Sequence, residues 1–163
     1  TGASRHVLAG LVDKSWLKHA STERYDIHEL LRQYGEDQLN SNTTEAEQTH
    51  DQHCHYFAHF LTEQWHILQG ANQITGLAQL EMEIDNIRTY WDWAIHHQHS
   101  GLVPSVFNTL WRFYDQGNRF QEGEQAFGKA ATIMKQSLND CLRGQLLARQ
   151  GSLRHSVGKA DEA

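Results

Sequence analysis

Apolar residues recur three or four positions apart along most of the chain, which is the spacing of an amphipathic helix. Two long helices are predicted in this way, over residues 45–69 and 74–97, and Gly70 ends the first of them. The apolar face of the first consists of Cys54, Phe57, Ala58, Leu61, Trp65 and Leu68. The apolar face of the second consists of Leu77, Leu80, Ile84, Ile87, Trp91 and Ala94.

Shorter helices are predicted in the last third of the chain. One begins near Pro104 and ends at Gly117-Asn118, and the next spans about 120–136. A further helix starts after Ser137 and is ended by Gly158, and another opens at Ala160. The inward-facing residues of the helix that starts after Ser137 are predicted to be Leu142, Leu146, Leu147 and Leu153.

The first forty residues follow a different pattern. A short helix ends near Ser15, and the segments WLKHA and RYDIH then alternate moderately around a polar turn, which predicts a β-hairpin. The segment HELLRQYGEDQL reads as a helix with Leu30, Leu31, Tyr34 and Leu39 inward. We expect the hairpin to pack on this helix through Trp16, Ile27, Leu30 and Leu31.

The composition narrows the functional classes. With 39% hydrophobic and 21% charged residues, the 163-residue chain is globular and mainly α, and no apolar run is long enough for a membrane span. Fourteen Lys and Arg against 20 Asp and Glu give a net charge of −6, which argues against nucleic-acid binding. Two cysteines provide no disulfide framework, so we expect a reducing, cytoplasmic environment.

Two segments carry a family resemblance. Residues 8–39, LAGLVDKSWLKHASTERYDIHELLRQYGEDQL, resemble the end of the winged-helix module of NB-ARC (STAND) signal-transduction ATPases. Residues 83–94, EIDNIRTYWDWA, resemble the helical linker that follows in the bacterial members. The glycine-rich phosphate-binding loop of that family is absent from this chain.

The resemblance assigns a role to one histidine. In the family, a Met-His-Asp-like tripeptide after the second strand places its His on the phosphates of ADP, and here the tripeptide is Ile27-His28-Glu29. The resemblance therefore makes His28 the cofactor-binding residue, with ADP or ATP and Mg²⁺ held by the full-length parent protein. The position at a helix start suits an anion, and the alternative is that His28 only caps the helix.

The second half is similar to tetratricopeptide (TPR) repeats. LWRFYDQGNRFQEGEQAF and LARQGSLRHSVGKADEA both read as helix, glycine turn and Glu-rich helix start. The two turn glycines, Gly117 and Gly158, are separated by more than the usual 34-residue repeat. Any antiparallel helix bundle would give a similar pattern.

Other chemistry has weaker support. His50, His53, Cys54, His55 and His59 crowd ten residues, and His96, His97 and His99 form a second cluster, but neither has clear third and fourth metal ligands. Glu81, Glu83 and Asp85 point in different directions on a helix, so solvated or capping roles are expected. Most of the Trp and Tyr residues fit core packing. We therefore assign no metal site and no catalytic residue.

The predicted organisation has three parts. These are the end of a partial winged helix with its β-hairpin (1–42), a linker helical hairpin (43–99) and TPR-like antiparallel helical hairpins cut short at the end (100–163). We expect a non-catalytic regulatory segment of a multidomain ATPase or transcriptional regulator, with signal transduction through the upstream nucleotide-binding domain and a protein or small-molecule effector on the repeats. Self-association, or fraying from about residue 140, is also expected. The alternative is a stand-alone helical-repeat module for protein–protein interaction.

Overall fold

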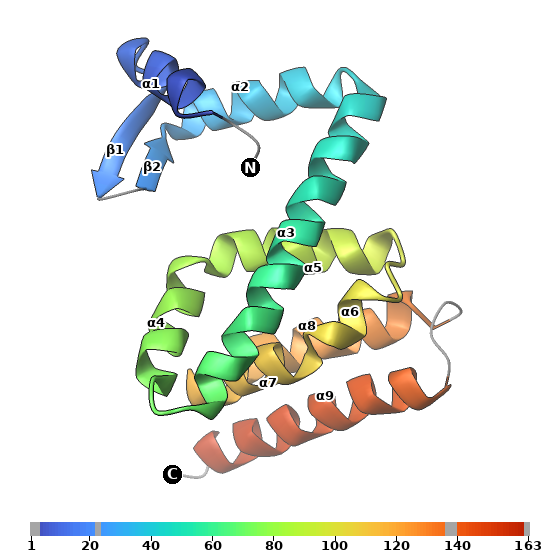
Figure 1. Cartoon of the computed structure of the whole chain (residues 1–163). Coiled ribbons are helices and arrows are strands. Elements are labelled where there is room, and N and C mark those ends of the chain that lie inside the picture. Colours follow the sequence, from blue (N-terminus) through green and yellow to red (C-terminus); the bar gives the residue numbers. More distant parts are fainter. Residues whose placement is uncertain (1–3, 22–23, 136–139, 162–163) are drawn as a thin grey trace. The chain divides into compact units, whose positions relative to one another are not determined.

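A computed structural model describes residues 4–21, 24–135 and 140–161, and these are mainly helical with a two-stranded antiparallel hairpin near the start (Figure 1). The predicted fold class, mainly α with a β-hairpin followed by antiparallel helical hairpins, is confirmed. The chain forms two compact units, Thr1–His53 and Cys54–Ala163. The three-part division at residues 42 and 99 stays a prediction.

The first unit contains the predicted helix, hairpin and helix. Helix α1 (Arg5–Asp13) begins at Ser4, whose Oγ accepts a hydrogen bond from the Val7 N–H at 3.3 Å. Strands β1 (Leu17–Ser21) and β2 (Arg24–Ile27) pair with Leu17 opposite Ile27, and α2 (Glu29–Asn40) follows. The local sequence pattern was therefore sufficient to predict the order and type of these elements.

The predicted inward face of α2 is partly wrong. Leu31 and Leu39 are half-buried, but Leu30 is 68% exposed and Tyr34 is 51% exposed. Trp16, itself 38% exposed, meets the Tyr34 ring edge-on with the ring centroids 6.1 Å apart. Neither α1 nor α2 contains a buried residue.

The second unit has a continuous hydrophobic core. Helix α3 (Thr43–Gln69) runs into it from the first unit, and α4 (Gln73–Met82), α5 (Ile84–His96), α6 (Leu102–Ser105), α7 (Phe107–Gln116), α8 (Phe120–Ile133) and α9 (Asp140–Asp161) follow. Its largest fully buried side chains come from six of these helices and from the residue after α8: Tyr90, Phe113, Phe127, Leu61, Leu68, Leu80, Ile87, Ile95, Leu110, Met134, Leu146 and Leu153. Most of the tyrosine and tryptophan residues assigned to the core do pack there, with Tyr90, Trp91 and Tyr114 buried.

The predicted single helix over 74–97 is wrong, because the chain forms two helices there. At Glu83 the backbone leaves the α conformation (φ −107°, ψ 11°), and α4 and α5 run in different directions on either side of it (Figure 1). Leu80 and Ile87 are nevertheless both fully buried. The apolar spacing thus continues through a bend, so periodicity alone did not reveal the break.

The prediction that Gly158 ends a helix is also wrong. Helix α9 continues through Gly158 to Asp161, so no new helix opens at Ala160. Gly117 does lie in a turn, where Asn118 adopts a left-handed φ of 54°. The two glycines are therefore not equivalent, and the proposed correspondence between two turns fails. Ser137, predicted to precede α9, lies outside the described residues.

Exposure along α9 differs from the prediction at one position. Leu146 and Leu153 are fully buried against the core, whereas Leu147 is 46% exposed. The expected self-association, or fraying from about residue 140, stays a prediction. Among the residues that the structure describes, no helix is long and apolar enough to cross a membrane.

Candidate functional site

His28 lies between β2 and α2, where the extended backbone turns into a helix. Its φ and ψ are −63° and 137°, and its side chain is exposed. The ring Nδ1 accepts a hydrogen bond from the Leu30 N–H at 3.3 Å, so His28 is the N-cap of the helix. Because Nδ1 acts as an acceptor, the proton of the neutral ring must be on Nε2, which is then a donor.

The two neighbours of His28 fix the junction. Ile27 is half-buried and pairs with Leu17 across the hairpin. Glu29 accepts a hydrogen bond from Arg32 at 2.7 Å, and hydrogen bonds from Arg32 and then Gln33 lower the pKa of Glu29 to about 2. The charge of the Glu29 carboxylate is thus compensated by Arg32.

The rest of the first unit presents apolar surface. Its exposed large apolar residues are Val7, Trp16, Tyr25, Leu30 and Tyr34. Among its described residues only Ala46 is buried. Folding must overcome roughly 1–2 kcal/mol of backbone entropy per residue, which apolar burial normally offsets. Of these residues, Trp16 and Tyr34 are in direct ring contact, which makes that pair a candidate interface of this unit.

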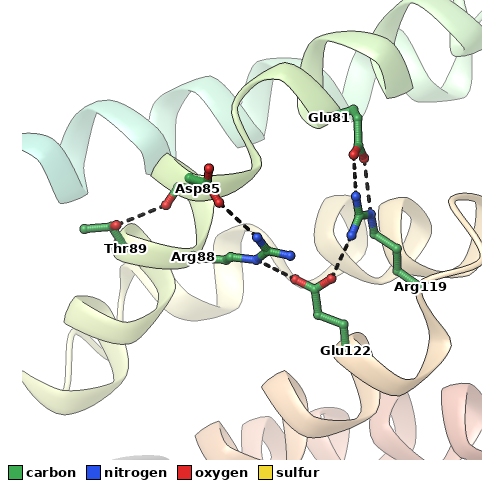
Figure 2. Close-up of polar contacts among 6 residues, drawn as sticks. All are labelled: Glu81, Asp85, Arg88, Thr89, Arg119 and Glu122. Atoms are coloured by element: carbon green, nitrogen blue, oxygen red, sulfur yellow. Dashed lines mark hydrogen bonds and ion pairs between the residues drawn. The ribbon is translucent and has the colours of Figure 1, made fainter. Parts of the chain in front are cut away.

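In the second unit, charged residues bridge separate helices (Figure 2). Arg119, just before α8, pairs with Glu81 of α4 and binds Glu122 at 3.0 Å. Arg88 of α5 binds the same Glu122 at 2.8 Å and Asp85 at 2.9 Å. These pairs connect α4 and α5 to the start of α8.

The acidic residues considered for catalysis form ion pairs or hydrogen bonds with neighbouring side chains. Glu81 and Asp85 pair with arginines, and Glu83 accepts a hydrogen bond from the Asn86 side chain at 2.7 Å. These carboxylates are held in ion pairs or hydrogen bonds with neighbouring side chains, and the assignment of no catalytic residue stays a prediction.

One histidine from each of the two clusters lies near the other in the structure. The rings of His55 and His99 are 6.5 Å apart, and those of His97 and His99 are 6.4 Å apart. His97 also stacks on Trp93 at 3.5 Å. Within residues 4–21, 24–135 and 140–161, however, no three His, Cys, Asp or Glu side chains are placed to hold a metal ion.

A groove of about 660 Å³ lies between α8 and α9. It is lined by Glu124, Gln125, Gly128, Lys129, Ala131, Thr132, Ile133, Lys135, Arg143, Leu147 and Gln150. A Cβ on Gly128 would lie 2.5 Å from Gln150 Nε2, so this glycine allows Gln150 to lie against α8. Sequence reasoning missed the groove, because its residues come from two helices whose relative rotation the sequence pattern does not define.

Comparison with known proteins gives no identification, because no family model, curated protein or solved structure matches the chain.

Proposed function

We propose that this chain is a non-catalytic regulatory segment of a larger NB-ARC-type ATPase, in which it couples the nucleotide state to a helical sensor array. The observation that carries the proposal is His28, exposed at a strand-to-helix junction with Nδ1 used for capping and Nε2 left as a donor. An imidazole N–H in this position suits a phosphate oxygen of ADP. The choice of ADP as the ligand rests on the family resemblance of the surrounding segment.

The surface of the first unit supports the same proposal. Trp16 and Tyr34 remain substantially exposed, as do Val7 and Leu30. In the proposed parent these side chains face the upstream nucleotide-binding domain, which holds ADP or ATP with Mg²⁺. The chain itself then needs no catalytic group, and its output is signal transduction or transcription regulation in the cytoplasm.

The test is calorimetry with ADP on the full-length parent and its His28 variants. His28→Ala removes a hydrogen bond to a charged group, worth roughly 1.5–3 kcal/mol, so ADP affinity should fall about ten- to a hundredfold. His28→Asp keeps an acceptor for the Leu30 N–H and adds a negative charge, so it should lose ADP binding while α2 stays capped. His6→Ala, an exposed histidine of the same unit, is the matched control. Equal affinities in the parent and both His28 variants would remove His28 from nucleotide binding.

A second candidate function is a stand-alone helical module for protein–protein interaction. The groove between α8 and α9 favours it, because that groove belongs to the helical hairpins and needs no nucleotide. The reading frame upstream of this segment separates the two functions. A phosphate-binding loop encoded there supports the first proposal, and a frame without one supports the second.

A further inference from the structure

Some charged residues that line the groove between α8 and α9 are paired with a side chain of opposite charge or a hydrogen-bond donor, and others are not. Near one part of it, Glu124 accepts hydrogen bonds from Gln150 at 3.1 Å and Arg154 at 2.7 Å, and these contacts lower the pKa of Glu124. Its negative charge is therefore compensated. Lys129 is likewise paired, with Asp92 at 2.7 Å.

Two further cations, Arg143 and Lys135, line the groove, and neither forms an ion pair with another described residue. Arg143 Nε is shielded from solvent and has no hydrogen-bond partner among the described residues. Lys135, also in the lining, is exposed and has no ion pair in the described part of the chain. Neither positive charge is compensated by an acidic side chain in the described part of the chain, and an uncompensated cation favours an incoming anion. These two positive charges stand out on a chain with a net charge of −6.

The third feature of the groove is apolar. Leu147 lies in the lining and is 46% exposed, and the half-buried Ile133 is also in the lining. A polyphosphate or nucleic acid would need more cations than two and would gain nothing from the leucine. A peptide with carboxylates beside one aliphatic side chain matches both features.

We propose that the groove between α8 and α9 binds an acidic peptide segment of a protein partner, with carboxylates on Lys135 and Arg143 and an aliphatic side chain on Leu147. The observations that carry it belong to the second unit alone, so it stands independently of the nucleotide proposal. An Arg can hold a carboxylate with two parallel N–H donors, and this geometry would orient the bound carboxylate.

Fluorescence anisotropy with a fluorescein-labelled peptide, Asp-Asp-Leu-Asp-Asp, tests this on the full chain. Arg143→Gln should weaken binding at least about tenfold and Lys135→Gln about three- to fivefold, since each removes one charge-assisted contact. Leu147→Ser, at an exposed position that tolerates change, should weaken binding about fivefold. The matched control is Lys14→Gln, which removes one exposed positive charge from the first unit and should leave binding unchanged.

Control peptides define the chemistry of the ligand. Lys-Lys-Leu-Lys-Lys should not bind, and Asp-Asp-Ser-Asp-Asp should bind less tightly than the leucine peptide. Equal binding of the acidic and basic peptides, or equal effects of Arg143→Gln and Lys14→Gln, would overturn the proposal. A concentration-dependent dimer in light scattering that Arg143→Gln abolishes would also overturn it, because a second copy would then be the occupant. Unchanged circular dichroism and melting temperature of each variant show that the fold is intact.

Discussion

Gly123 of α8 lies where α7 and α9 both pack closely against that helix. It is buried in α8, and a Cβ built there would lie 2.7 Å from Leu153 Cδ1 of α9 and 2.7 Å from Tyr114 Cβ and Cγ of α7. Ordinary carbon–carbon contacts are about 3.5–4.0 Å, so a methyl group does not fit without movement. Tyr114 Cβ is attached directly to the backbone, so relief would require α7 itself to shift.

Gly123→Ala therefore combines two opposed effects. Replacing a glycine inside a helix by alanine normally stabilises it by about 1 kcal/mol. Inserting a methyl group into a core closed on both sides costs roughly 2–4 kcal/mol, at or above the usual range for overpacking. The steric term is larger, so we expect the free energy of unfolding to fall by about 1–3 kcal/mol.

Gly151→Ala in α9 is the matched control. A Cβ at Gly151 has no atom within 4 Å, so only the helix-propensity gain applies, and the free energy of unfolding should rise by about 0.5–1 kcal/mol. Urea unfolding followed by circular dichroism measures both changes. A Gly123→Ala protein as stable as the parent would refute the packing of α7, α8 and α9. A Gly151→Ala protein that is less stable would refute the continuous helix α9.

Two further predictions depend on pH. Burial raises the pKa of Tyr90 and of Tyr114 above the ordinary value, so the stability that these neutral side chains contribute is present below about pH 10 and is lost as the pH rises further. In an absorbance titration, two of the five tyrosines should therefore ionise only as the chain unfolds, and five equivalent tyrosines near pH 10 would contradict this. Burial by itself would raise the pKa of Glu122. Hydrogen bonds and charge from Arg88 and then Arg119 outweigh burial, so the pKa is lowered. The stability that ionised Glu122 contributes to the fold is therefore present above about pH 4.5 and is lost as the pH falls. Glu122→Gln should cost about 1 kcal/mol in urea unfolding at pH 7, discounted for partial exposure, and the difference should shrink at pH 3; an equal cost at both values would rule out an ionic origin.

The sequence predicted the helices well where an apolar stripe met a clear stop. Gly117 was interpreted correctly because the chain does turn there, with Asn118 in the left-handed region. Gly158 was misread because a glycine inside a helix costs only about 1 kcal/mol and a long, packed helix tolerates it. The break at Glu83 was invisible because Leu80 and Ile87 keep the same spacing on both sides of it.

The candidate sites differ in how far the sequence could reveal them. His28 was singled out by the family resemblance of the tripeptide Ile27-His28-Glu29. Its capping role is a local interaction that sequence neighbours determine. The groove could not be found in this way. Arg143 and Leu147 are near neighbours on α9, but the environment of the arginine depends on how α8 packs against that helix. An arginine Nε that is buried without an acceptor among the described residues is a property of the packed helices and leaves no signal in spacing or composition.

The contrast between the two units bears directly on how a regulatory segment could work. The second unit has its own core and its own ion pairs, so its fold is stabilised from within. The first unit has the hairpin and the His28 cap, but among its described residues only Ala46 is buried, so a surface that covered Trp16 and Tyr34 would add to its stability. A partner that binds only the folded form stabilises it by RT ln(1 + [L]/Kd), about 2.7 kcal/mol at a hundredfold excess over Kd. If the affinity of that partner surface differs between its ADP and ATP states, the order of the first unit follows the nucleotide, because a ligand shifts an equilibrium only through such a difference.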